Sequence, residues 1–154
     1  RPGHFEGVLG VINQFLKIIK AKYMFLGEKD FQQVFLIKNH VKKKRFKTKI
    51  LTCKTIRYRN YLPFSSRNML LKTSQISVAS NVSRLIKKYS LLIKKDFNNK
   101  YKVNDIIKIL KKMDLKVEYF EIKNKKNLSN KFNKNNFKIF IAYYINGVRL
   151  IDNI

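Results

Sequence analysis

Cysteine is almost missing from this chain, since Cys53 is the only one among 154 residues. A single thiol cannot close a disulfide within the chain, and no CxxC motif or Cys/His cluster has the spacing of a zinc site. These absences exclude a disulfide-stapled secreted module and a structural zinc fold. A reducing compartment fits this cysteine usage.

Long apolar runs are also missing. Lysine interrupts the apolar stretches every few residues, so no window of about 20 residues could cross a bilayer, and we expect no membrane partner. The opening residues do not resemble a signal peptide with its small-residue cleavage site. Because the sequence opens with Arg1 rather than Met, we expect it to be a fragment of a longer protein.

Acidic residues are scarce: nine Asp and Glu face 35 Lys and Arg, which gives a net charge of +26 and a pI near 10.3. Such a balance is typical of proteins that bind nucleic acid, because basic side chains release counterions from phosphates. However, 28 of the 35 are Lys, whereas bidentate phosphate recognition favours Arg. Abundant Asn, Ile, Phe and Tyr accompany them, as AT-biased coding would produce. Both explanations of the charge stay open.

What is present is enough apolar material for a core, with 45% hydrophobic and 13% aromatic residues. A chain of this length forms one ordinary domain or two small ones. In the first part, apolar spacing predicts a helix over 5–20, a strand over 22–26, a helix over 30–45 and a strand over 47–55. This order predicts a parallel sheet covered by helices.

The second part has a different pattern. Residues 56–68 carry Pro63 and several polar groups, and predict a connecting loop or domain linker. After it we expect helices over 73–95 and 103–113, strands over 115–122, 136–145 and 148–154, and a Lys- and Asn-rich solvated loop over 123–136. The second half is thus predicted to be helices beside a small sheet.

The stretch "FLGEKDFQQ" (25–33) places charge at the end of the first predicted strand. Ligands of open parallel sheets bind at the carboxyl ends of the strands. Gly27 allows a tight turn, the following helix offers N–H groups to an anion, and Lys29 adds a positive charge, so this segment could hold a phosphate. A plain turn in which Asp30 caps the helix is the alternative. "SSRN" (65–68) allows the same two interpretations.

Four separated motifs resolve these alternatives: "RPGHFEGV" (1–8), "GEKDFQQ" (27–33), "SSRN" (65–68) and "RLIDN" (149–153). In this order and spacing they resemble the pantothenate synthetases, also called pantoate beta-alanine ligases. The resemblance is close over 1–68 and looser over the remainder. It implies an α/β fold: residues 1–55 as the end of a Rossmann-like nucleotidyltransferase domain that binds ATP and pantoate, and residues 56–154 as a small α+β lid domain.

The resemblance also implies a reaction. Pantoate attacks the α-phosphate of ATP to give pantoyl adenylate and pyrophosphate, and β-alanine then displaces AMP to form pantothenate. Mg²⁺ accompanies the ATP, and these enzymes are homodimers of the cytoplasm that do not use nucleic acid as a partner. A basic nucleic-acid-binding protein of ribosomal type is the alternative from another class.

Site residues are carried over only where they match the family's motifs. Lys29 and Arg67 would be catalytic, with Lys29 stabilising charge on the phosphates as pyrophosphate leaves. Gln33 would bind pantoate through its amide. ATP contacts would come from Gly27, Glu28, Lys29, Asp30, the backbone of Ile56, Phe64, Ser65, Ser66 and Arg67. No metal ligand is assigned.

Two departures from the family pattern stand out. Asn60 and Tyr61 occupy the place where the family usually has an Asp-Gly pair, so the path of this loop is not carried over from the family. The family's histidine motif, which grips ATP and supplies the principal catalytic His, is absent from these residues. We therefore expect residues 1–154 alone to be inactive.

Overall fold

A computed structural model describes residues 3–97 and 103–154 of the chain. Arg1 and Pro2 of the "RPGHFEGV" motif lie outside the described residues. The chain divides into two compact units, Arg1–Thr55 and Ile56–Ile154. The sequence placed the boundary between its two predicted domains at the same position, while the functions expected of those domains stay predictions.

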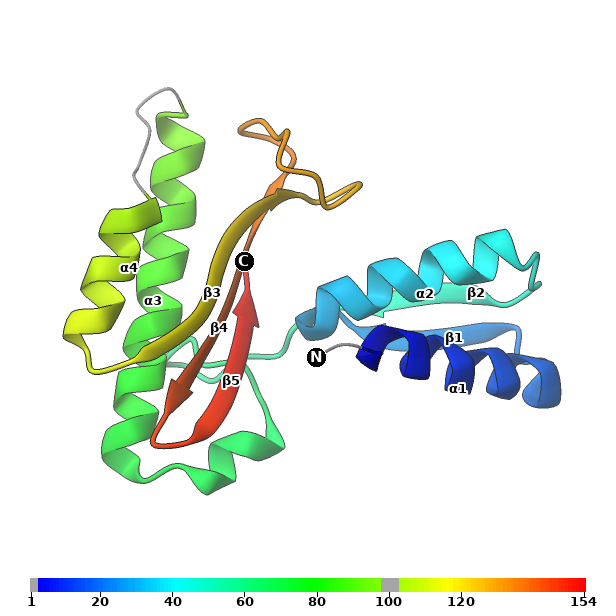
Figure 1. The fold of residues 1–154 in the computed structure, drawn as a ribbon, viewed down its shortest axis with the longest axis horizontal. Coiled ribbons are helices and arrows are strands. Elements are labelled where there is room, and N and C mark those ends of the chain that lie inside the picture. The colour runs from blue at the N-terminus through cyan, green and yellow to red at the C-terminus, as the bar shows by residue number, and fades with distance from the viewer. Residues whose placement is uncertain (1–2, 98–102) are drawn as a thin grey trace. The chain divides into compact units, whose positions relative to one another are not determined.

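The first unit contains a two-stranded parallel sheet and two helices (Figure 1). Its elements in order are α1 (His4–Ile19), β1 (Tyr23–Gly27), the 3-10 turn η1 (Glu28–Asp30), α2 (Phe31–Lys43) and β2 (Lys49–Cys53). The strands pair in parallel, from Tyr23 opposite Lys49 to Gly27 opposite Cys53. The predicted parallel pair is confirmed, and the carboxyl ends of both strands meet at one edge.

Both helices pack against one face of this sheet. Leu16, Ile37 and Val41 are the buried centre of the core, and the half-buried residues around them are Val8, Leu9, Ile12, Met24, Leu26, Phe46 and Ile50. The spacing of three and four residues in α1 brings its apolar residues to one side of the helix. Because side chains alternate along a strand, Tyr23, Phe25 and Leu51 lie on the other face of the sheet, where they are exposed.

The second unit is a three-stranded antiparallel sheet with two helices beside it (Figure 1). After a loop and the 3-10 turn η2 (Ser66–Leu70) come α3 (Thr73–Lys95), α4 (Val103–Lys112), β3 (Lys116–Asn124), β4 (Phe137–Ile145) and β5 (Val148–Asn153). The strands pair in the order β3-β4-β5. The predicted small α+β arrangement is confirmed.

Helix α3 and the central strand β4 form the core of the second unit. Val82, Ile86, Tyr89 and Ile93 recur at helical spacing on α3 and are buried. On β4 the buried residues of the same cluster include Ile139, Ile141 and Tyr143. Each fully buried aliphatic or aromatic side chain contributes about 1.5–3 kcal/mol, so this helix–sheet contact is a main source of stability for the unit.

Two segments predicted as loops are more ordered than expected. In the first, Arg57 pairs with Pro63 in an isolated β-bridge before η2 begins. In the second, β3 extends to the buried Asn124, whose side chain donates to the Lys131 carbonyl and accepts from the Lys126 N–H, both at 2.9 Å. Asn side chains can satisfy turn backbone in this way, which composition alone does not reveal.

Within residues 3–97 and 103–154, no helix has both the length and the apolar character needed to cross a membrane.

Candidate active site

The first group of predicted site residues follows β1 at its carboxyl end. Gly27 has extended backbone angles (φ −72°, ψ 131°), so no left-handed turn requires a glycine here. Apart from its chain neighbours, no heavy atom lies within 4 Å of a Cβ built at Gly27. The backbone at this strand end is therefore open to close approach by another molecule.

Glu28, Lys29 and Asp30 form the turn η1 that leads into α2. Lys29 is half-buried and Asp30 is exposed. Asp30 stands at the N-cap position of α2, but its side chain makes no capping hydrogen bond, so the plain capping role considered for it is wrong. Gln33 is half-buried in the first turn of α2. The helix changes from 3-10 to α between Lys29 and Gln33.

Strand β2 adds Cys53 to the same edge of the sheet. Cys53 is the register partner of Gly27, and its thiol is free and exposed. The preceding Thr52 accepts a hydrogen bond at 2.7 Å from the Lys38 ammonium of α2. No motif of the sequence predicts a role for Cys53 in the site. Its pairing with Gly27 nevertheless makes this thiol a natural reporter for the Gly27–Asp30 loop.

The second group of predicted residues lies together in one loop of the second unit. Ser65 accepts a hydrogen bond from the Arg67 N–H at 3.3 Å and caps η2, so the capping role considered for this motif is confirmed. The Arg67 guanidinium donates to the Arg149 carbonyl of β5 at 3.3 Å. The Phe64 N–H donates to the Ile56 carbonyl at 3.0 Å, which brings the two apolar residues of the prediction side by side.

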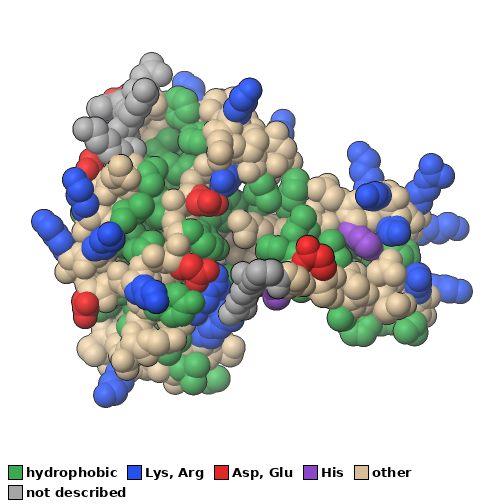
Figure 2. All heavy atoms as spheres, viewed as in Figure 1, with side chains coloured by type: hydrophobic (Ala, Val, Ile, Leu, Met, Phe, Trp, Pro, Cys, Tyr) green, Lys and Arg blue, Asp and Glu red, His purple; other side chains and the backbone are tan. Residues whose placement is uncertain are grey.

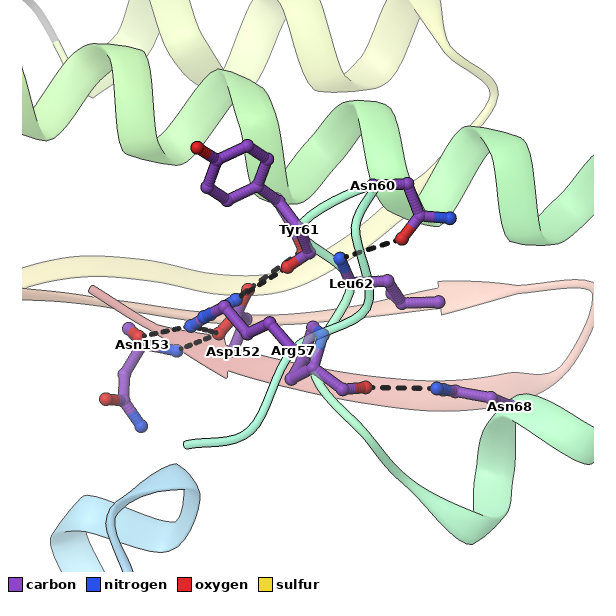
Figure 3. A network of polar contacts seen from close by, with 9 residues as sticks. Arg57, Asn60, Tyr61, Leu62, Asn68, Asp152 and Asn153 are labelled. Atoms are coloured by element: carbon purple, nitrogen blue, oxygen red, sulfur yellow. Dashed lines mark hydrogen bonds and ion pairs between the residues drawn. The ribbon is translucent and has the colours of Figure 1, made fainter. Parts of the chain in front are cut away.

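A buried ion pair fixes the start of this loop to β5 (Figure 3). Arg57 makes a bidentate pair with Asp152, with distances of 2.7 and 2.9 Å, and also donates to the backbone carbonyls of Tyr61 and Asn153. Ser83 of α3 donates to the same carboxylate at 2.9 Å. The Asp152 side chain is only 2% exposed, against 21% for Arg57. This carboxylate is thus almost fully enclosed by donors.

No pattern in the sequence predicts this network. Arg57 and Asp152 are 95 positions apart, and no periodicity links a loop to the last strand at that distance. The "RLIDN" motif carries the family resemblance but predicts no role for its Asp. The available signal was a single acidic residue that follows Leu150 and Ile151 in a predicted strand, where a buried charge is costly unless it has a partner.

Tyr61 follows Asn60 in the loop and has a backbone φ of 72°, in the left-handed region. The Asn60 side chain accepts from the Leu62 N–H at 3.2 Å and closes the turn. The Lys87 ammonium of α3 lies 3.7 Å from the centroid of the Tyr61 ring. A hydrogen bond from Lys87, and its positive charge, lower the pKa of Tyr61.

Charge is unevenly distributed over the first unit. Its three acidic residues are Glu6, Glu28 and Asp30, and the sequence has no further acid until Asp96. Where both helices end and both strands begin, exposed basic residues gather (Figure 2). This basic end consists of Lys17, Lys20, Lys22, Lys42, Lys43, Lys44, Arg45, Lys47 and Lys49. Across the described ranges, no three His, Cys, Asp or Glu residues come together as a metal-binding group.

Comparison with solved structures defines the class of protein. The chain superimposes over its whole length on the crystal structure of a pantoate-beta-alanine ligase from Francisella tularensis complexed with "Beta-gamma ATP and Beta-alanine", with a TM-score of 0.78 and 35% identity, covering 51% of that protein. The pantothenate synthetase of Thermus thermophilus matches with the same TM-score at 23% identity, over 56% of its length. The chain therefore has the nucleotidyltransferase-type α/β fold of these proteins.

Sequence comparison then gives the family. The profile of the family described as Pantoate-beta-alanine ligase matches residues 1–154. The pantothenate synthetase of Francisella tularensis subsp. novicida (strain U112) is 39% identical over 99% of the chain, and that of Francisella philomiragia subsp. philomiragia is 38% identical over the same share. The chain belongs to the pantoate-beta-alanine ligase family, and it spans about half the length of these relatives.

Proposed function

We propose that this chain is the ATP- and pantoate-binding part of a ligase that condenses pantoate with β-alanine. The reaction passes through pantoyl adenylate and yields pantothenate, AMP and pyrophosphate. The observation that carries the proposal is the family match over all 154 residues. A relative 35% identical to the chain was crystallised as a complex with an ATP compound and β-alanine, which supports the same substrates here.

The first unit contributes the strand-end loop to this proposal. The open backbone at Gly27 and the N-terminus of α2 suit the phosphates of ATP, with Glu28 and Asp30 completing the contact loop. Lys29 is the catalytic cation that stabilises negative charge as pyrophosphate leaves. Gln33 follows in the first turn of α2 and binds pantoate through its amide.

The second unit contributes the "SSRN" loop. Its hydroxyls at Ser65 and Ser66 and the Arg67 guanidinium bind the triphosphate, and Arg67 is the second catalytic cation. The Ile56 backbone and the Phe64 side chain contact the adenosine end. Ile56 is 72% exposed and Phe64 is 49% exposed, so both have apolar surface available for a ligand.

Three further features of the proposed enzyme are its metal cofactor, its oligomeric state and its cellular compartment. Mg²⁺ arrives with ATP, because this ion is usually held by substrate phosphates and its own waters rather than by an all-protein cage. The working enzyme is a homodimer in the cytoplasm. Residues 1–154 alone are expected to make no pantothenate, because the family's histidine motif is not among them.

The test uses the natural gene product that contains these residues. It should catalyse exchange of pyrophosphate into ATP only when pantoate is present, and it should make pantothenate when β-alanine is added. Lys29→Ala should lower the exchange rate by about 100-fold, the usual cost of losing one preorganised charge contact. Lys94→Ala changes an exposed lysine near the end of α3 and should keep the wild-type rate. Absence of pantoate-dependent exchange in the wild type would refute the proposed function.

A further inference from the structure

Strand β5 holds the loop of residues 56–68, which ends with the "SSRN" motif, at two points. At the start of the loop, Arg57 is bonded to the Asp152 carboxylate and the Asn153 carbonyl of β5. At its end, Arg67 donates to the Arg149 carbonyl of the same strand. Both anchors on β5 belong to the "RLIDN" motif, whose function the proposed reaction leaves unexplained.

Hydrogen bonds and a stacked pair of rings connect the residues between these anchors, so the parts of the loop move together. The Tyr58 N–H donates to the Leu62 carbonyl at 2.9 Å, and the rings of Tyr58 and Phe64 stack with centroids 3.8 Å apart. Near the end of the loop, the Asn68 amide donates to the Pro63 carbonyl at 3.0 Å. A shift of Arg57 is therefore transmitted through Pro63 and Phe64 to Ser65.

Asp152 is the centre on which the first anchor depends. Its Oδ1 accepts from Arg57 and from the Asn153 N–H, both at 2.7 Å, and its Oδ2 accepts from Arg57 and Ser83, both at 2.9 Å. Four donors fix the carboxylate in position and rotation. A buried ion pair contributes little more net stability than apolar side chains of the same volume, so the distinctive contribution of this pair is geometry.

We propose that Asp152 is a positioning residue for nucleotide binding: together with Ser83 it fixes Arg57, and Arg57 fixes the loop that presents Ser65 and Arg67 to the phosphates of ATP. This inference rests on the proposed function. Neither Asp152 nor Arg57 contacts the substrate in this role. Their effect reaches the reaction only through the position of the loop.

The decisive experiment separates loop geometry from stability. In the natural gene product, Asp152→Asn should raise the KM for ATP about tenfold, because a small misplacement of binding groups is costly, and should lower the urea midpoint of unfolding. The double variant Arg57→Met/Asp152→Leu replaces the pair by apolar side chains. Its urea midpoint should return close to wild type, while its KM for ATP should stay raised about tenfold. A double variant that recovers the wild-type KM along with its stability would overturn the proposal.

A matched control comes from a second ion pair on this sheet. Arg149 makes a bidentate pair with Glu118, at 2.7 and 2.9 Å, but Glu118 is exposed. Glu118→Gln should leave the KM for ATP at the wild-type value. A rise equal to that of Asp152→Asn would show that any loss of charge on the sheet has this effect, and would contradict the assignment.

Failure of the proposed function can be told apart from failure of this inference. If the wild type shows no pantoate-dependent exchange, the proposed reaction fails, and amide hydrogen exchange then decides the positioning role. The N–H groups of Tyr58 and Phe64 should exchange faster in the stable Arg57→Met/Asp152→Leu variant than in the wild type. Unchanged exchange at both amides would show that the ion pair does not fix the loop.

Discussion

Tyr61 occupies a backbone conformation that favours glycine. A residue with a Cβ at φ 72° costs about 1–2 kcal/mol. The Lys87 ammonium lies 3.7 Å from the centroid of the Tyr61 ring, a favourable contact that offsets part of this cost. Helix α3 thus supplies a compensating contact at the point where the backbone of Tyr61 is strained.

Substitutions at Tyr61 test this balance. Tyr61→Gly removes both the strain and the Lys87 contact, so its free energy of unfolding should stay within about 1 kcal/mol of the wild type. Tyr61→Val loses the contact and keeps a branched side chain at positive φ, so it should be less stable by roughly 1–2 kcal/mol. Urea unfolding measures both values. Equal stability of the two variants would contradict a left-handed conformation at Tyr61.

Cys53 allows nucleotide binding to be measured at one residue. Its thiol is exposed, is the only one in the 154 residues and pairs across the strands with Gly27. If ATP binds at the Gly27–Asp30 loop, Mg²⁺-ATP should slow alkylation of Cys53 by iodoacetamide about threefold or more, because bound ligand restricts access to a reactive thiol. Peptide mass spectrometry follows the modification. Mg²⁺-GTP is the matched control, and equal protection by both nucleotides, or by neither, would argue against a specific ATP site at this strand end.

At the scale of elements, strand β4 carries a titratable group in the centre of the core. Burial raises the pKa of Tyr143, and the negative charge of Asp152 raises it further. An unfolded tyrosine has a pKa of about 10. The folded protein therefore holds this proton more tightly than the unfolded chain does. The contribution of Tyr143 to stability is complete below about pH 10 and is lost as the pH rises further.

This linkage predicts an alkaline loss of stability to which the Tyr143 hydroxyl contributes a measurable share. Between about pH 9 and pH 11 the free energy of unfolding should fall, with a share of up to about 1.4 kcal/mol per pH unit from Tyr143. In urea titrations at each pH, the free energy of unfolding of Tyr143→Phe should fall less steeply, by the share that Tyr143 contributes in the wild type. Identical slopes for the two proteins would mean that Tyr143 titrates alike in the folded and unfolded states.

Across the whole molecule, local patterns predicted the elements far better than the contacts between them. The apolar spacing in α1 and α3, and the order helix, strand, helix, strand, were sufficient for the fold class. The turn η1 was not predicted as a 3-10 segment, because "EKD" has no period of its own. The ion pair between Arg57 and Asp152 was not predicted, because its two residues are 95 positions apart in the sequence and only folding brings them together.

The candidate site could be predicted only in part for a related reason. The roles that short motifs suggested for Lys29, Gln33 and the "SSRN" residues stay predictions. The structure places Ile56, Phe64, Ser65, Ser66 and Arg67 in one loop. The residues that hold this loop carry no motif of their own beyond "RLIDN". Support of this kind depends on hydrogen-bond geometry, which residue types and spacing do not encode.

Whether the net charge of +26 serves nucleic-acid binding can be tested at the basic end of the first unit. Exposed cations gather there with no acidic residue among them. Single-stranded RNA or DNA should bind there at low salt through phosphate contacts alone. Its affinity should fall steeply with salt, with a slope of about −0.7 in log K per phosphate neutralised, and should be weak at about 150 mM salt.

Charge reversal locates the contact. Lys42→Glu/Lys43→Glu/Lys44→Glu should abolish the low-salt binding and leave pantoate-dependent pyrophosphate exchange unchanged, since these residues lie at the opposite end of the strands from Gly27. The matched variant Lys94→Glu/Lys111→Glu/Lys112→Glu changes exposed lysines of α3 and α4 and should retain most of the low-salt binding. Tight binding that survives physiological salt, measured by fluorescence anisotropy, would instead support a nucleic-acid function for the chain, because a nonspecific phosphate contact cannot persist there.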